Sequence, residues 1–502
     1  MKQHSGLFLA IDQSTSGTKA LLFTPQGRIL DQEALSHRQL YPLAGWVEHD
    51  AEEIFNNVVK ASSLLLKRHP GELNSLLGIS IANQRETFVI FDRETGQPLH
   101  NAIVWQCRRG DAICQQLVQE GKEEFVRNLT GLRIDTYFPA SKLRWLLDSD
   151  ANVCTRLKDG SALFGTIDTY LIYRLTGGRV YATDHTNASR TLLYDIEKLA
   201  WSSDLCGVFG VKLGRLPEIR ESAEWYGDTD LAGTLDRRVP IYGVMGDSQA
   251  ALFAQRCFTP GSVKVTFGTG SSILLNIGHE RRLTSSGTVT AVGWVLQGKP
   301  TYAFEGIINF TGATIAWLRD QLQLIKDSQE TETLSLSVTD SDGVYFIPAF
   351  VGLSAPYWRS DARAAILGMT PSTTRAHVAR AALESIGYIV TDVLRAMSQD
   401  SDTTLTMVHA DGGAVRNTFL MQFVADLNQL KVRAAQDPEL SALGAVFSGW
   451  LGMKIHNSLE DLEKLPLGFV EYESLMESDR ANSLFAGWRS AVQQVLYQPK
   501  QG

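Results

Sequence analysis

The chain contains two similar strand–turn–strand units about half a chain length apart. In the first unit, residues 6–11 and 19–23 are the predicted strands, and the small polar residues 12–18 form the turn between them. The second unit spans residues 263–277, with its turn at residues 268–272. A unit repeated at this separation predicts a duplicated architecture with one phosphate-binding hairpin in each half.

Hairpin turns of this kind can bind a phosphorylated ligand. Hydroxyl side chains and glycine allow backbone N–H groups to surround a phosphate, and Asp12, which opens the first turn, can hold a magnesium ion directly or through water. Taken alone, each turn is more typical of an ordinary polar hairpin loop. The chain has no GxxxxGK[ST] run, and Ile273 stands where a dinucleotide fingerprint needs its third glycine, so neither common nucleotide motif is indicated.

A strand-to-helix junction lies near the middle of the chain. An apolar run from residue 241 ends at Gly246 and Asp247, and a helix-like run follows. Glycine permits the turn, and Ser248 can cap the helix. Asp247 is then presented at the carboxyl end of a strand, where open α/β sheets place their chemistry. A lone Gly-Asp pair is more typical of a capped turn, and the neighbouring motifs favour the functional interpretation.

Other polar and aromatic residues follow predicted strands. Arg85 and Glu86 come after a strand at residues 77–81 and can bind hydroxyl groups as donor and acceptor, although a surface ion pair has the same sequence pattern. Trp105 ends another strand and is suited either to core packing or to contact with the carbon face of a polyol. A strand–glycine–helix unit at residues 405–427 is compatible with a nucleotide site or with a tight connection.

Composition restricts the class of protein. A chain of 502 residues predicts two or more domains, and 44% hydrophobic with 20% charged residues is typical of a globular protein. A net charge of -8 argues against a nucleic-acid or membrane-surface protein. Five scattered cysteines without CxxC pairs predict a reducing compartment and no structural zinc. The short apolar run at residues 7–11 is too short for a signal peptide or a membrane span, so we expect a cytoplasmic protein.

Several motifs together resemble the glycerol kinases of the FGGY carbohydrate kinase family, in the actin-like ATPase superfamily. The resemblance runs from about residue 11 to about residue 492. Its most specific stretches are residues 45–50, 83–87, 101–109, 164–169, 186–191, 348–350, 355–358 and 411–415, with family signatures at residues 137–145 and 368–384.

The resemblance implies an α/β fold of two duplicated ribonuclease-H-like domains that flank a central cleft. We expect these domains to be residues 1–252, with the polyol site and the first hairpin, and residues 253–502, with the second hairpin and the adenine site. The resemblance also implies an ATP-dependent kinase that uses Mg²⁺ and forms a homodimer or homotetramer, with no nucleic-acid or membrane partner.

The resemblance assigns roles to individual residues. Asp247 is implied to be the general base and Asp12 to help hold magnesium. The residues implied to contact the polyol are Arg85, Glu86, Trp105, Tyr137 and Asp247. The residues implied to line the ATP site are Thr15, Ser16, Lys19, Thr269, Gly312, Gly413 and Asn417.

Two departures from the family concern the polyol pocket. Ser248 stands where glycerol kinases usually have Gln, and Ser272 where they usually have Phe, which predicts a larger and more polar pocket. The expected reaction is phosphorylation of a terminal hydroxyl of glycerol or a close polyol, with a tetritol or a ketose (dihydroxyacetone or a pentulose) as the alternative. A non-catalytic sugar sensor on the same fold is a further alternative, against which the retention of Asp12 and Asp247 argues.

Overall fold

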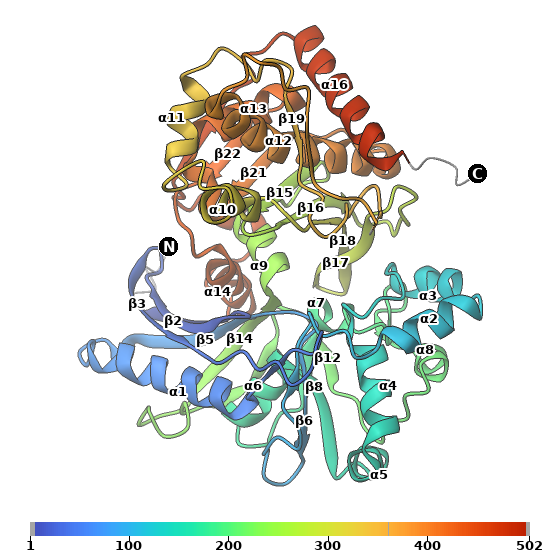
Figure 1. The fold of residues 1–502 in the computed structure, drawn as a ribbon. Coiled ribbons are helices and arrows are strands. Elements are labelled where there is room, and N and C mark those ends of the chain that lie inside the picture. Colours follow the sequence, from blue (N-terminus) through green and yellow to red (C-terminus); the bar gives the residue numbers. More distant parts are fainter. Residues whose placement is uncertain (1–5, 360, 498–502) are drawn as a thin grey trace.

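The computed structural model describes residues 6–359 and 361–497, which form two lobes, each built on a mixed β-sheet (Figure 1). The sheet of the first lobe has the strand order β13-β14-β5-β1-β2-β3. Its strands are β1 (Leu7–Gln13), β2 (Gly17–Phe23), β3 (Ile29–Ser36), β5 (Leu76–Asn83), β13 (Trp225–Thr229) and β14 (Val239–Gly246). Within it, β5 and β14 run parallel to β1, whereas β2 is antiparallel to β1.

The sheet of the second lobe has the order β17-β18-β16-β15-β21-β22-β23. Its strands are β15 (Ser262–Phe267), β16 (Ser271–Gly278), β17 (Val289–Leu296), β18 (Lys299–Ile308), β21 (Met407–Asp411), β22 (Val432–Ala435) and β23 (Phe469–Tyr472). Here β15 is antiparallel to β16 and parallel to β21, which is parallel to β22. The series β18-β16-β15-β21-β22 therefore repeats β3-β2-β1-β5-β14 in order and direction. The predicted duplication and the predicted fold class are confirmed.

Helices cover both faces of the first sheet. On one face, Leu9, Ile11 and Ile79 pack with α1 (Ala51–Lys67) and α6 (Ile167–Leu175). Helix α1 begins where the Asp50 side chain accepts hydrogen bonds from the backbone N–H groups of Glu52 and Glu53. On the other face lie α9 (Asp247–Ala254) and α14 (Leu440–Gly452).

Helix α14 comes from the second half of the chain but packs on the sheet of the first lobe (Figure 1). Its Phe447 and Trp450 lie in one buried cluster with Phe8 and Phe23. Gly444 allows α14 to approach α9 closely, because a Cβ atom there would lie 1.8 Å from the Ala250 carbonyl oxygen. The chain therefore crosses between the lobes more than once.

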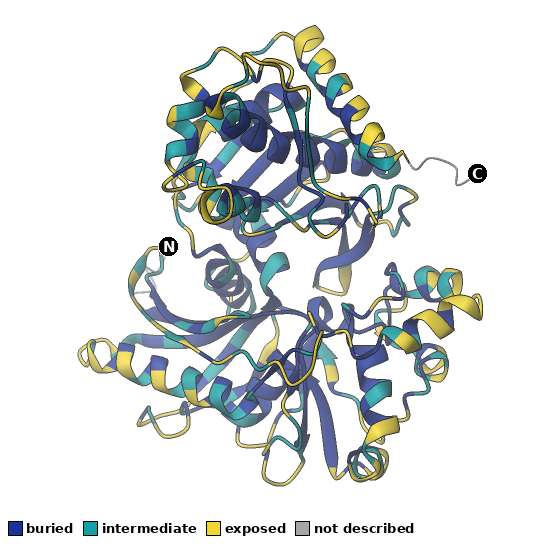
Figure 2. Cartoon of the chain, viewed as in Figure 1, coloured by how far each residue is buried: buried dark blue, intermediate teal, exposed yellow. Residues whose placement is uncertain are grey.

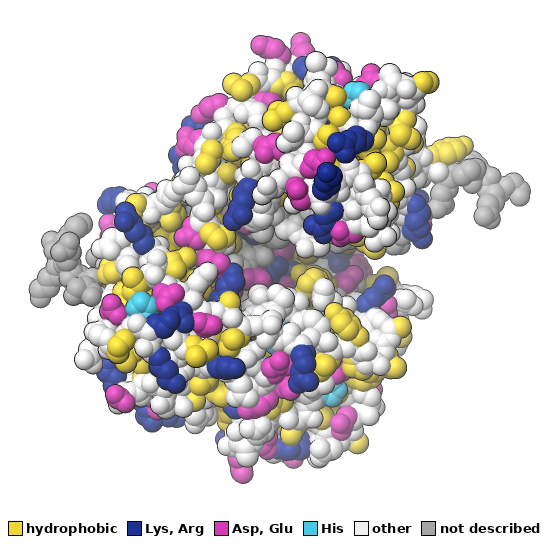
Figure 3. All heavy atoms as spheres, turned by 60° about the vertical axis from the view of Figure 1, so that its left-hand side comes forward, with side chains coloured by type: hydrophobic (Ala, Val, Ile, Leu, Met, Phe, Trp, Pro, Cys, Tyr) yellow, Lys and Arg dark blue, Asp and Glu magenta, His cyan; other side chains and the backbone are white. Residues whose placement is uncertain are grey.

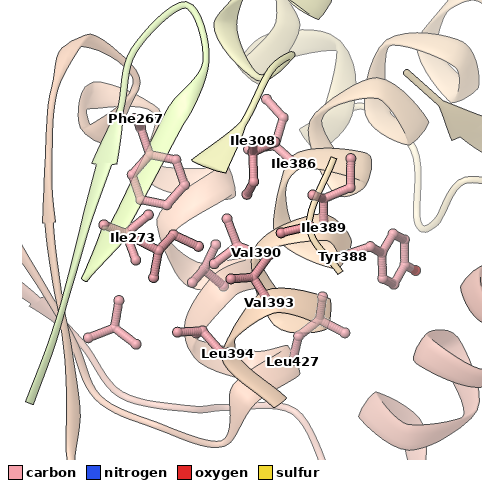
Figure 4. Packing of buried hydrophobic residues seen from close by; sticks show 14 of the residues in the cluster. Phe267, Ile273, Ile308, Ile386, Tyr388, Ile389, Val390, Val393, Leu394 and Leu427 are labelled. Carbon is pink, nitrogen blue, oxygen red and sulfur yellow. The ribbon is translucent and has the colours of Figure 1, made fainter. Parts of the chain in front are cut away.

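The second sheet is covered on its outer face by α12 (Arg375–Ser401) and α13 (Thr418–Asn428). Figure 4 shows Phe267 and Ile273 of the strands against Val390, Val393 and Leu394 of α12. Figure 2 shows the same pattern in both lobes, with buried strands and with exposed residues on the outer faces of the helices. The opposite face of this sheet is turned towards α9 and the first lobe.

A smaller sheet with the order β4-β7-β6-β8 extends the first lobe. It consists of β4 (Glu48–His49), β7 (Ala102–Ile103), β6 (Phe88–Asp92) and β8 (Ala162–Thr166), beside α2 (Asp111–Gln119), α3 (Glu123–Thr130), α4 (Pro139–Ser149) and α5 (Ala151–Asp159). The remaining elements are η1 (Leu73–Ser75), β9 (Ala182–Asp184), α7 (His185–Ala188), β10 (Tyr194–Asp195), β11 (Ala200–Trp201), α8 (Ser203–Val208), β12 (Glu218–Arg220), α10 (Gly312–Asp320), α11 (Glu330–Leu336), β19 (Tyr345–Ile347), β20 (Ala365–Leu367), η2 (Gly413–Arg416), α15 (Leu459–Glu463) and α16 (Ser478–Leu496).

The central junction has the predicted strand and helix, but one detail of the prediction is wrong. Helix α9 begins at Asp247, with Gly246 at the cap position and no side-chain cap. Ser248 therefore lies inside the first turn rather than at the cap, and its hydroxyl faces Ser272 at 3.5 Å. Among the described helices, none is both long and apolar enough to cross a membrane.

Candidate active site

A cavity of about 810 Å³ lies between the two lobes. Figure 3 shows the hollow between the lobes, with charged side chains inside it. The residues that line it include Thr15, Gln84, Arg85, Glu86, Trp105, Tyr137, Arg190, Asp247 and Ser248 of the first lobe and Thr266, Thr269, Ser272, Ile307, Ser354 and Trp358 of the second. All seven residues predicted to form the polyol site meet in this one cavity.

Asp247 occupies the start of α9, at the carboxyl end of β14, as the sequence predicts. Its side chain is 37% exposed, and its Oδ1 lies 3.4 Å from Arg85 Nε. The same Oδ1 accepts a hydrogen bond of 2.6 Å from the Ser248 backbone N–H. Asp247 is thus an accessible carboxylate with a fixed orientation, which is what a general base requires.

Trp105 and Tyr137 form an aromatic wall of the cavity. Their ring centroids lie 5.2 Å apart, and Trp105 Nε1 donates a hydrogen bond of 3.0 Å to Thr15 Oγ1. The buried Lys142 Nζ fixes the backbone of both aromatic residues, because it donates hydrogen bonds to the carbonyl oxygens of Tyr137 at 3.2 Å and of Trp105 at 3.3 Å. Burial lowers the pKa of Lys142 to about 8.

Arg85 and Glu86 belong to a buried ionic network. Arg85 Nη2 donates to Glu305 Oε1 at 2.7 Å, and Arg190 Nε donates to Glu86 Oε1 at 2.6 Å. Arg190 Nη1 lies 2.5 Å from Glu305 Oε2, and none of the four side chains is more than 4% exposed. The interpretation of Arg85 and Glu86 as a surface ion pair is therefore wrong, since both side chains are buried in the wall of the cavity.

The backbone at Glu86 is unusual. Its φ angle is 61°, in the left-handed region that residues with a Cβ atom seldom adopt. Strained backbone of this kind is found at functional sites where surrounding contacts hold it in place. Here the ion pair with Arg190 holds the side chain.

Arg190 and Glu305 are the two members of this network that sequence reasoning missed. Arg190 lies in the stretch 186–191, which resembles the family, but its sequence neighbours do not indicate a role. Glu305 had a signal of its own, because it is a single carboxylate in the apolar run of β18. Lys264 in β15 has the same signal, and it is 1% exposed.

Ser248 and Ser272 lie next to each other at one end of the cavity, with their Oγ atoms 3.5 Å apart. Ser272 comes from β16 and stands opposite Ile307 of β18. Cross-strand neighbours of this kind have Cβ atoms about 5 Å apart, so Ile307 supplies some apolar surface beside the serine. The two serines together give this end of the cavity two adjacent hydroxyl groups.

The residues predicted to bind ATP are spread over both lobes. Thr15 and Thr269 line the cavity, whereas Ser16, Lys19, Gly312, Gly413 and Asn417 lie outside its wall. Lys19 Nζ is ion-paired with Glu439 at 2.6 Å. Gly312 passes so close to the second hairpin that an added Cβ would lie 2.6 Å from the Gly268 oxygen. Asn417 caps α13, because its Oδ1 accepts from the Leu420 N–H at 2.9 Å.

Asp12 is the penultimate residue of β1, where it stands opposite Lys19 of β2. Burial, together with the negative charges of Asp247 and Glu439, raises the pKa of Asp12 to about 7. Lys19 opposes this shift, but its ammonium group is already paired with Glu439, so burial and the two carboxylates outweigh it. In the described ranges, no group of three or more His, Cys, Asp or Glu side chains is placed to hold a metal ion.

Comparison with known proteins gives one consistent result. The model of the FGGY family of carbohydrate kinases matches residues 7–254 with its N-terminal domain and residues 263–453 with its C-terminal domain. Glycerol kinase 1 of Thermotoga maritima is 44% identical over 488 residues, which cover 97% of this chain and 99% of that protein. Glycerol kinase of Symbiobacterium thermophilum is 45% identical over 495 residues, covering 98% of this chain and 99% of that protein.

The comparison with solved structures agrees. The crystal structure of Plasmodium falciparum glycerol kinase with ADP superposes with a TM-score of 0.94 at 35% identity and covers 99% of each chain. A ligand-bound xylulose kinase from Lactobacillus acidophilus has a TM-score of 0.88 at 19% identity, covering 98% of this chain and 99% of that one, so it shares the fold.

Proposed function

This chain belongs to the FGGY family of carbohydrate kinases, and we propose that it transfers the γ-phosphoryl group of ATP to a terminal hydroxyl of glycerol or a closely related polyol. The observation that carries the proposal is the accessible Asp247 carboxylate, which faces Arg85 in the cavity between the two hairpin-bearing lobes. The similarity to glycerol kinases over nearly the whole chain supports the same reaction.

In the proposed reaction, Asp247 accepts the proton of the attacking hydroxyl. Arg85 donates to a substrate hydroxyl, Glu86 accepts from one, and the wall of Trp105 and Tyr137 covers the carbon chain. Phosphoryl transfer needs mainly positioning and charge neutralisation, so one base and a shaped cavity are sufficient protein chemistry. The backbone N–H groups of the two hairpin turns would bind the phosphates, with Thr15 and Thr269 nearest the polyol.

The residues at the first hairpin fit a magnesium ion. Asp12 is buried beside the carboxylates of Asp247 and Glu439, and Lys19 only partly offsets their charge, so a bound cation would stabilise its ionised form. Magnesium usually keeps several waters and binds one or two carboxylates together with substrate phosphates, so no cage of protein ligands is needed. When bound, the ion would neutralise charge on the transferred phosphate. We propose that Asp12 is the principal protein ligand.

The alternative substrate is a longer polyol or a ketose. Two adjacent hydroxyls, those of Ser248 and Ser272, replace an amide and a phenyl group at one end of the pocket. Ile307 offsets part of the lost apolar surface, which favours glycerol. The domain division near residue 252, the assembly as a homodimer or homotetramer and the cytoplasmic location stay predictions.

A substrate panel tests the proposal. We expect ATP-dependent phosphorylation with the highest kcat/KM on glycerol, measured beside dihydroxyacetone, erythritol, threitol and xylulose. Highest kcat/KM on a tetritol or a ketose would support the alternative. An absence of turnover with every member, while ATP and polyol still bind, would support the non-catalytic sensor instead.

A further inference from the structure

Glu305 is the one carboxylate of β18, and it is buried behind the residues that line the cavity. Along β18, side chains alternate between the two faces, so Glu305 and Ile307 share the face turned to the first lobe. Ile307 lines the cavity, whereas the side chain of Glu305 does not reach the cavity surface and is completely buried. An ionised carboxylate that is fully buried needs a positively charged partner, because an unpaired buried charge is costly. The partners of Glu305 therefore indicate what it does.

Both partners of Glu305 come from the other lobe. Arg85 Nη2 donates to its Oε1 at 2.7 Å, and Arg190 Nη1 lies 2.5 Å from its Oε2. Burial alone would raise the pKa of Glu305, but Arg190 and Arg85 outweigh it and lower the pKa to about 2. Glu305 is thus ionised at any working pH, and it ties two arginines of the first lobe to the second lobe.

These contacts leave Arg85 little freedom. Its Nη2 is held by Glu305, its Nη1 by Gln249 Oε1 at 3.2 Å, and its Nε lies 3.4 Å from Asp247 Oδ1. A guanidinium is a rigid planar fork, so fixing two of its nitrogens sets the direction of the third. The direction of the Arg85 fork, and with it the contact to Asp247, depends on a carboxylate that belongs to the other lobe.

We propose that Glu305 is a positioning residue, which orients Arg85 for polyol binding only when the two lobes are correctly placed. The proposal rests on the proposed kinase function. It extends that function, because it makes the polyol site of the first lobe sensitive to the position of the second lobe. Arg190 shares the same carboxylate and orients Glu86 in the same way.

The test is steady-state kinetics of Glu305→Gln on the best polyol of the panel. We expect kcat/KM for the polyol to fall about 100-fold, the cost of a misplacement of about 1 Å, while the KM for ATP stays within threefold. In an Arg85→Lys background, which has no planar fork to orient, Glu305→Gln should lower kcat/KM by less than threefold. If Glu305 had a purely structural role, its replacement would raise the KM for the polyol and the KM for ATP to a similar extent.

Glu384→Gln is the matched control. Glu384 is also buried in the second lobe and bonds Arg380 Nε at 2.8 Å, but it lies in α12, away from the cavity. We expect its thermal stability to fall while the polyol kinetics stay unchanged. If Glu305→Gln does not fold, Glu305→Asp takes its place, since it keeps the charge but is one methylene shorter.

The proposal is overturned if the folded Glu305 variant keeps wild-type kcat/KM for the polyol. It is also overturned if the KM for ATP rises as much as the KM for the polyol, or if the loss is undiminished in the Arg85→Lys background. These outcomes differ from a failure of the kinase proposal, in which the wild type itself turns over none of the polyols.

Discussion

Replacement of Asp247 by asparagine tests the assignment of the general base. The exchange keeps the shape of the side chain and removes its charge. The amide oxygen can still accept the 2.6 Å hydrogen bond from the Ser248 N–H, so the first turn of α9 should keep its geometry. Arg85 loses its 3.4 Å neighbour but keeps Glu305 at 2.7 Å, so no buried charge is left without a partner.

The expected loss is therefore confined to the chemical step. General-base assistance contributes about 10²–10⁴-fold. At 1.36 kcal/mol for each factor of ten, this is about 3–5 kcal/mol in the activation free energy. The free energy of unfolding should change by less than about 1 kcal/mol, because the side chain is 37% exposed and stays hydrogen-bonded.

The assay couples ADP release to a spectrophotometric readout, with ATP and polyol binding measured separately by calorimetry. Asp228→Asn is the control, because Asp228 is a partly exposed aspartate of the same lobe that also accepts a single hydrogen bond, from Trp225 Nε1. We expect wild-type turnover from the control. A kcat for Asp247→Asn within threefold of the wild type would refute the assignment of Asp247 as the base.

The other predictions concern specificity, stability and motion. Ser248→Gln combined with Ser272→Phe should raise the ratio of kcat/KM for glycerol to that for erythritol by tenfold or more, since a misfit of one methylene is worth about 1–3 kcal/mol; an unchanged ratio would exclude these serines as specificity determinants. Lys142→Met should lower the free energy of unfolding, measured in urea, by about 1–3 kcal/mol, because buried carbonyl oxygens lose their donor. It should also raise the KM for the polyol, and an unchanged KM would contradict a role of Lys142 in holding the aromatic wall. Burial, aided by His37, lowers the pKa of His49 to about 3, so this group stabilises the fold above pH 6.5 and loses that contribution as the pH falls towards 3. The stability deficit of His49→Gln, measured in urea, should therefore shrink by about 1 kcal/mol between pH 7.5 and 5.5, and a constant deficit would count against it. Finally, small-angle scattering with polyol and a non-hydrolysable ATP analogue should show a smaller radius of gyration than the free protein, and an unchanged radius would argue against closure of the lobes.

Local pattern was enough to predict much of this protein. The two hairpins, the strand before Asp247 and the glycine turn before α13 all lie where the sequence predicts them. The reason is physical, because alternating or continuous apolar runs and small-residue turns express preferences of neighbouring residues. The repeated hairpin also predicted the duplicated sheets, and the motifs predicted the kinase family, which the comparisons confirm.

Tertiary structure decided which of these residues act together. Arg85 and Glu305 are separated by 220 positions in the sequence, and no period or spacing relates them. Helix α14 lies on the first sheet although it follows the second in sequence, and its place depends on close contact at Gly444. Ser248 was expected at a helix cap and instead lies beside Ser272 in the wall of the cavity. Sequence patterns report local conformation and burial, whereas the pairing of buried charges depends on which surfaces meet when the two lobes pack.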